Sequence, residues 1–127
     1  MILKHILWVG FGGAIGSILR YLVSYFTYAK AGKEYLTFPW PTFIVNLFGC
    51  LLIGLLVGLS QKHVSFDDQL KLFLITGFCG GFTTFSAFSL ENMQMYQSGH
   101  YLTLGLYVLS SVLLGILLVW LGMIFVK

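Results

Sequence analysis

Charged side chains are scarce in this sequence. Of its 127 residues only 9% are charged, whereas 58% are apolar, and the mean hydropathy is +0.92. A soluble domain usually carries about a quarter charged residues, so this chain cannot cover a water-exposed surface and is expected to lie in a lipid bilayer. Its basic residues are scattered rather than clustered on one face, so we expect no nucleic-acid partner.

Cysteine is scarce too, and catalytic patterns are missing. Cys50 and Cys79 lie in separate apolar runs without CxxC spacing, which predicts buried thiols. The sequence contains no Ser-His-acid, metal-ligand or phosphate-loop pattern, so we expect no enzyme. We also expect no acidic residue well inside a span. This argues against a proton-coupled transporter, because that class usually needs an intramembrane carboxylate.

Long runs of apolar residues make up most of the sequence. Each is close to the roughly 20 residues that a helix needs to cross the hydrocarbon of a bilayer. We therefore predict an all-α integral membrane protein with one four-helix membrane domain over residues 1–127, with short connections that make consecutive helices antiparallel neighbours. Lysines are distributed too evenly to fix an orientation, and insertion both ways is physically allowed. The predicted spans are about 2–28, 38–59, 70–90 and 101–126.

The third run interrupts its own helical pattern. Between Gly77 and Ser89 it has paired glycines and consecutive threonines, which weaken a helix and release backbone carbonyls. We predict that this helix is broken in mid-membrane, because broken helices are a recurring way to build an ion site. The alternative is a continuous helix whose threonines bond to their own backbone.

Glycine pairs spaced four apart predict surfaces where helices approach closely. Gly12 and Gly16 form one pair, and Gly54 and Gly58 form the other. A subunit interface and packing within one chain explain each pair equally well. Arg20 is within reach of the end of its span, about 9 Å at the helical rise, so we favour a side chain that snorkels to the headgroups over a charge at a pore mouth.

Polar and aromatic side chains recur at helical spacing within the predicted spans. Hydroxyl and amide groups donate hydrogen bonds to anions, and the edge of a phenyl ring carries partial positive charge. A lining without a fixed cation binds a small anion weakly enough to release it. These residues therefore predict a path for a small anion. Asn46 is the most telling of them, because a buried amide in hydrocarbon needs hydrogen-bond partners. The candidates are the phenylalanines that share one helix face (Phe78, Phe82, Phe85 and Phe88), the hydroxyls beside them (Thr83, Ser86 and Ser89), Thr42 with Asn46, and Thr103, Tyr107, Ser110 and Ser111.

These residues make the chain resemble the fluoride channel family (Fluc, also called CrcB). The resemblance extends over all four predicted spans, and the motif of the third span is the most specific. The matching segments are Gly12-Gly13-Ala14-Ile15-Gly16 with Arg20-Tyr21, Thr42 through Val45-Asn46 to Gly49, and Gly77-Phe78-Cys79-Gly80-Gly81-Phe82-Thr83-Thr84-Phe85-Ser86.

The resemblance implies a passive, fluoride-selective channel that exports fluoride from the cytoplasm across the bacterial plasma membrane. It also implies an antiparallel dual-topology homodimer with two pores. Phe85 and Phe88 would face fluoride and Asn46 would donate an amide N–H. The other pathway positions would be Thr42, Ser86, Tyr107, Ser111 and Glu91, with Arg20 as a charge at the mouth. A structural Na⁺ at the dimer centre would be held by the backbone carbonyls of Gly80 and Thr83.

Ala87 departs from the family pattern, which often has threonine or serine between the two phenylalanines. The departure removes one donor and keeps a heterodimer of unlike subunits open as an alternative. Two other functions are also open. A small four-helix drug exporter fits the size, but it needs an acidic residue in the first span, where this chain has Arg20. A non-transporting accessory subunit leaves the predicted helix break unexplained.

Overall fold

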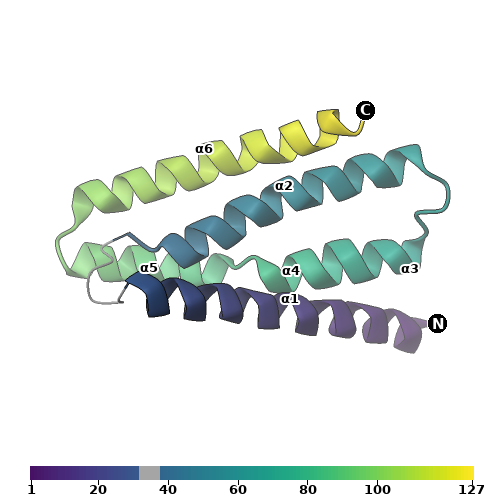
Figure 1. The fold of residues 1–127 in the computed structure, drawn as a ribbon, viewed down its shortest axis with the longest axis horizontal. Coiled ribbons are helices and arrows are strands. Elements are labelled where there is room, and N and C mark those ends of the chain that lie inside the picture. The colour runs from purple at the N-terminus through teal and green to yellow at the C-terminus, as the bar shows by residue number, and fades with distance from the viewer. Residues whose placement is uncertain (32–37) are drawn as a thin grey trace.

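The computed structural model describes residues 1–31 and 38–127. Within them, all regular structure is helical, and four helices are long and apolar enough to cross a membrane. Two of the four are the uninterrupted helices α1 (Ile2–Ala31) and α2 (Trp40–Lys62). The fourth span is α6 (Tyr101–Phe125). The predicted number of spans and the all-helical class are thus confirmed (Figure 1).

The third span, Asp68–Gln97, is a composite of four pieces. It begins with α3 (Asp68–Lys71), which Asp67 caps by accepting a hydrogen bond from the Leu70 N–H at 2.9 Å. A π-helical stretch follows, η2 (Leu72–Cys79), and then the short α4 (Gly80–Phe82). After Thr83 and Thr84 the chain resumes as α5 (Phe85–Gln97). The interruption that the sequence predicted is present, whereas the π-helix was not expected.

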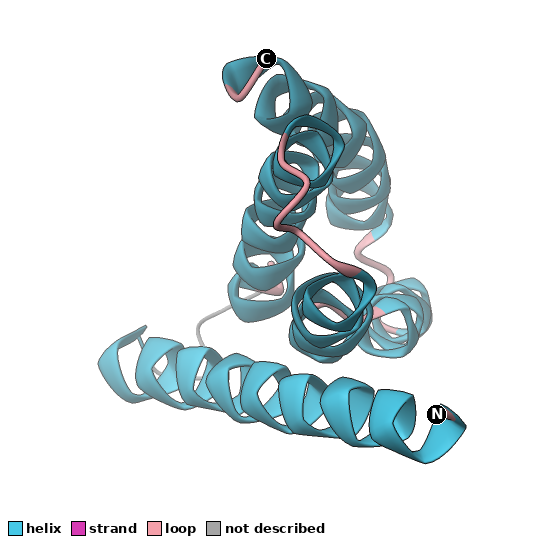
Figure 2. Cartoon of the chain, turned by 90° about the vertical axis from the view of Figure 1, so that its right-hand side faces the viewer, coloured by secondary structure: helices cyan, strands magenta, loops and turns pink. Residues whose placement is uncertain are grey.

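The helices that pack most extensively against each other are not the ones that follow each other in the chain. The most extensive packing joins α2 to α6 and joins α1 to η2 and α4, whereas α1 and α2 contact each other less. Figure 2 shows α1 lying across the base of the bundle, inclined to the other helices. Consecutive helices do contact each other, but they are not the most extensively packed pairs, because loop length fixes direction but not packing partner.

Both predicted glycine pairs lie against helices of the same chain. A Cβ on Gly16 would come within 2.8 Å of the Phe82 nitrogen, and one on Gly54 would come within 3.0 Å of the Val119 Cα. The first contact brings α1 onto α4, and the second brings α2 onto α6. Close packing within one chain, one of the two alternatives left open by the sequence, accounts for both pairs.

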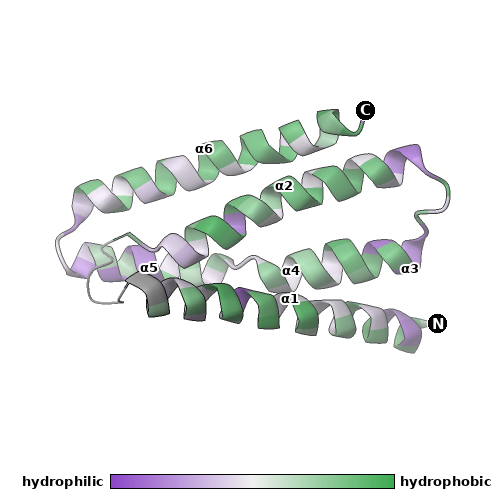
Figure 3. Cartoon of the chain, in the orientation of Figure 1, coloured by the Kyte–Doolittle hydropathy of each residue, from purple (hydrophilic) through white to green (hydrophobic). Residues whose placement is uncertain are grey.

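A single chain buries little of its apolar surface. Its hydrophobic core is small and includes Val45, Phe82 and Tyr107, while many large apolar side chains of α1 and α6 are exposed. Figure 3 shows hydrophobic colour along most of α1, α2 and α6, and hydrophilic colour where α2 ends and on α3 and α5. Because a water-soluble monomer rarely leaves so large an apolar surface open, lipid and other protein surfaces are expected to cover it.

Candidate functional site

The break in the third span is formed by two threonines in extended conformation. Thr83 has φ −89° and ψ 160°, and Thr84 has φ −152° and ψ 124°. The Thr83 hydroxyl donates to the Cys79 carbonyl at 2.8 Å, which closes the first half of the span. The Thr84 hydroxyl oxygen accepts from the Ala87 N–H at 3.2 Å and so caps the second half. Threonine is a preferred residue at this capping position.

Asn46 on α2 pairs with the backbone of the break. Its Nδ2 donates to the Thr84 carbonyl at 3.1 Å, and its Oδ1 accepts from the Thr84 N–H at 2.9 Å. The amide thus replaces two hydrogen bonds that a continuous helix would have made. One N–H of the Asn46 amide group remains available to another acceptor. The sequence identified Asn46 as a polar residue that needs partners, and the structure gives it two.

Two carbonyls beside the break lose their helical donors. In a continuous helix the Gly80 carbonyl would accept from the Thr84 N–H, and the Thr83 carbonyl from the Ala87 N–H. The first of these N–H groups is bonded to Asn46, and the second is bonded to the Thr84 hydroxyl. Both carbonyl oxygens are therefore available to a ligand, and Gly80 is exposed.

Arg20 also binds the backbone next to the break. Its Nε donates to the Gly81 carbonyl at 3.1 Å, so a cation from α1 stabilises a carbonyl of the third span. The position of Arg20 in the sequence favoured a side chain that snorkels to the headgroups. The half-buried Arg20 is instead tied to the broken helix, which makes it part of the structure around the site.

A pocket of about 580 Å³ opens beside the break. It is an open pocket bordered by residues of α2, η2, α4, α5 and α6, and most of its lining is apolar. Both cysteines line it, and both thiols are free. None of the described lining residues carries a charge. The lining residues are Asn46, Gly49, Cys50, Ile53, Ile75, Thr76, Cys79, Gly80, Thr83, Thr84, Phe85, Phe88, Ser111 and Val112.

A row of aromatic rings leads away from this pocket. Phe85 is 79% exposed, and its ring centroid lies 5.9 Å from that of Phe88. The Phe88 ring is 4.9 Å from the ring of Tyr107, which in turn is 5.2 Å from Phe38. The two phenylalanines that the sequence placed on one helix face are thus the start of a continuous row that crosses to α6 and to the beginning of α2.

At Tyr107 the row meets a half-buried carboxylate cluster, which consists of Thr42, Glu91 and Tyr107. The Thr42 hydroxyl donates to Glu91 Oε2 at 2.6 Å, and the Tyr107 hydroxyl donates to Glu91 Oε1 at 2.8 Å. Tyr107 is fully buried, and Thr42 is only 7% exposed. Both carboxylate oxygens are therefore held by neutral hydroxyl donors from two different helices.

Glu91 corrects one expectation from the sequence. The third span was predicted to end at about residue 90, just before Glu91, but α5 continues to Gln97 and Glu91 lies within the helix. The helix end was therefore predicted too early, whereas the expected absence of an acidic residue well inside a span stays a prediction.

The structure divides the predicted site residues into two groups. Asn46, Gly80, Thr83, Phe85, Phe88 and Ser111 line the pocket, whereas Thr42, Glu91 and Tyr107 form the carboxylate cluster. Contact between the Phe88 and Tyr107 rings connects the groups. Ser86 is exposed outside both groups, and its hydroxyl lies 3.3 Å from that of Thr84. Thr84 itself was not among the predicted site residues, although a threonine directly before a helical run is a capping signal.

Comparison with known proteins finds one matching family and several relatives that share one name. Residues 7–123 match the family described as CrcB-like protein, Camphor Resistance (CrcB). The chain is 53% identical over 122 residues to a protein of Azobacteroides pseudotrichonymphae, covering 96% of this chain and 95% of that protein. It is 47% identical to a protein of Flavobacterium psychrophilum, with 98% of each chain covered. A Leptospira interrogans protein is 45% identical, with 98% of this chain and 95% of that one covered. Each relative is named "Fluoride-specific ion channel FluC".

Proposed function

The chain belongs to the CrcB-like protein family, and we propose that it is a passive, fluoride-selective channel through which fluoride leaves the cytoplasm. With its four membrane-length helices, it is a multi-pass protein of a bacterial membrane. The observation that carries the proposal is the near-full-length identity, 53% in one case, to proteins named as fluoride-specific channels. The relatives' names also favour a channel over a drug exporter or an accessory subunit.

The proposed pathway follows the aromatic row from the pocket to the carboxylate cluster. Fluoride entering the pocket would meet the edges of the Phe85 and Phe88 rings, which carry partial positive charge. The second N–H of Asn46 and the hydroxyl of Ser111 are donors in the same pocket. Because the described lining has no basic side chain, fluoride would be bound weakly enough to move on.

Glu91 would control access to two further donors. The hydroxyls of Thr42 and Tyr107 both direct their protons at its carboxylate, so an arriving fluoride has to compete with Glu91 for them. Two negative charges about 4 Å apart repel each other by roughly 4 kcal/mol at an effective dielectric constant of about 20. We propose that this competition keeps fluoride from settling at the cluster.

The break supports the proposal of an antiparallel homodimer with Na⁺ at its centre. The available carbonyls of Gly80 and Thr83 supply the oxygen ligands that a hard cation prefers. A Cβ on Gly80 would meet no atom within 4 Å in the single chain, so this face has room for a second copy. Two copies would double the number of carbonyl ligands, and Na⁺ when bound would neutralise their combined negative potential.

Native mass spectrometry of the purified protein tests this assembly. We expect a mass equal to that of two chains. We also expect the dimer to dissociate less readily in a Na⁺ salt than in the salt of a bulky organic cation. A single-chain mass from folded protein would contradict the homodimer and favour a heterodimer with an unlike subunit.

The alanine at position 87 does not disturb the break itself, since its N–H is the group that Thr84 caps.

Replacing Phe85 with isoleucine tests the pathway. We expect fluoride efflux from proteoliposomes to fall by at least about tenfold, the equivalent of ~1.4 kcal/mol, because an aliphatic side chain offers no polarised ring edge. Phe125→Ile is the matched control, since Phe125 is 83% exposed at the far end of α6. Equal efflux from both variants would remove Phe85 from the pathway.

A further inference from the structure

A second pocket lies at the other end of the bundle from the carboxylate cluster. Its volume is about 460 Å³, and it lies where α2 and α6 end. Thr42 and Lys62 are at opposite ends of α2, about 30 Å apart at the helical rise. None of the residues assigned to the proposed fluoride pathway lines this pocket. Its lining consists of Gly58, Gln61, Lys62, Trp120, Met123, Ile124, Val126 and Lys127.

The walls of this pocket are apolar and partly exposed. Gly58 lets α6 approach α2 so closely that a Cβ there would lie 3.1 Å from the Met123 carbonyl oxygen. Beside this contact, Trp120 is 55% exposed and Ile124 is 40% exposed. Tryptophan is enriched where the hydrocarbon meets the headgroups, because its ring is apolar and its N–H is polar. The walls are thus suited to an acyl chain that runs along the helices.

Two cations stand at the rim of the same pocket. Lys62 is in the last turn of α2, and Lys127 follows the end of α6; both side chains are exposed. Within the described part of the chain, the ion pair that forms is between Lys71 and Asp68, at 3.9 Å, and includes neither of them. The helix dipole explains a lysine at the end of α2, but it does not explain two lysines that share an apolar pocket with a tryptophan.

We propose that this pocket binds an anionic phospholipid, with the headgroup phosphate between Lys62 and Lys127 and an acyl chain against Trp120 and Ile124. Basic residues at a membrane surface attract anionic lipids, and the apolar walls select a lipid over a free anion. In an antiparallel pair of chains, one such pocket would face each leaflet. The proposal does not depend on fluoride transport.

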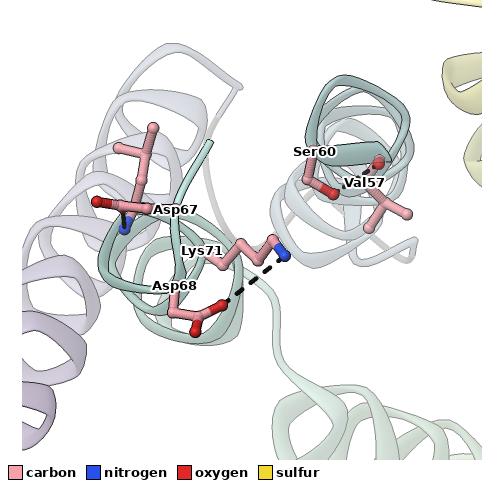
Figure 4. A network of polar contacts seen from close by, with 6 residues as sticks. Val57, Ser60, Asp67, Asp68 and Lys71 are labelled. Carbon is pink, nitrogen blue, oxygen red and sulfur yellow. Dashed lines mark hydrogen bonds and ion pairs between the residues drawn. The ribbon is translucent and has the colours of Figure 1, made fainter. Parts of the chain in front are cut away.

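Thermal unfolding in mild detergent tests the site. Added phosphatidylglycerol is expected to raise the melting temperature at concentrations where phosphatidylcholine and inorganic phosphate have no effect. The double variant K62Q/K127Q should bind phosphatidylglycerol about thirtyfold more weakly, at roughly fivefold for each lysine. K71Q is the matched control, because Lys71 also lies near the end of the bundle but reaches to Asp68 instead (Figure 4).

Three results would overturn the proposal. Equal lipid affinity in K62Q/K127Q and K71Q would mean that the two lysines do not form a site. Equal stabilisation by phosphatidylcholine would mean that the headgroup charge is not recognised. Saturation by inorganic phosphate alone would identify a site for free anions rather than for lipid. The substituted lysines are exposed, so the variants are expected to fold, and the melting curve of each lipid-free variant checks this directly.

Discussion

Asn46→Leu is expected to lower fluoride efflux by about a hundredfold or more. The substitution leaves the N–H and the carbonyl of Thr84 without the partners they have at 2.9 and 3.1 Å. A buried polar group without a partner costs about 1–3 kcal/mol, so the two together cost roughly 3 kcal/mol or more. The break can then keep its geometry only in a small fraction of molecules. The measurement is initial fluoride release from proteoliposomes, normalised to incorporated protein.

Asn92→Ala is the matched control for this variant. Asn92 is another asparagine within a helix, but its Nδ2 donates to the Phe88 carbonyl of the same helix, α5. We therefore expect it to retain most of the efflux. Full activity of folded Asn46→Leu would show that the break does not depend on the cross-helix amide, and would remove the main structural support for the site.

Gly16→Ala is expected to destabilise the protein by at least about 1–3 kcal/mol, the usual cost of overpacking. The new methyl group would lie 2.8 Å from the Phe82 nitrogen and 3.2 Å from the Gly81 backbone carbon. Because backbone atoms cannot rotate away as a side chain can, α1 has to move off the third span. That movement would also pull Arg20 from the Gly81 carbonyl. The change is measured as a lower melting temperature and a smaller folded fraction in detergent.

Gly10→Ala provides the comparison on the same helix. A Cβ on Gly10 meets nothing within 4 Å, and alanine is about 1 kcal/mol more favourable than glycine inside a helix. We expect this variant to be as stable as the parent or more stable. If both alanine variants had the same melting temperature as the parent, the close contact of α1 with α4 would be wrong.

The sequence was sufficient for the features that follow from composition and local pattern. Apolar runs of membrane length predicted the four spans, and the glycines and threonines after Gly77 predicted the interruption that occurs at Thr83 and Thr84. Asn46 could be singled out because a buried amide group needs hydrogen-bond partners. These properties depend on a residue and its near neighbours along the chain, so they can be read without knowing the packing.

Packing between distant segments could not be predicted in the same way. Thr84 as the partner of Asn46, Gly81 as the partner of Arg20, and the meeting of Thr42 with Glu91 all depend on which helices pack together. The end of the third helix was also missed, because the sequence does not show that Glu91 finds hydroxyl donors on two other helices.

The most direct test of the central claim uses liposomes that contain the purified chain alone. With valinomycin present to balance charge and no pH gradient, we expect rapid fluoride release and chloride release at the level of protein-free liposomes. This result would establish a passive, selective channel that needs no unlike partner subunit and no proton coupling. Equal release of both anions, or no fluoride release from well-folded protein, would contradict the account.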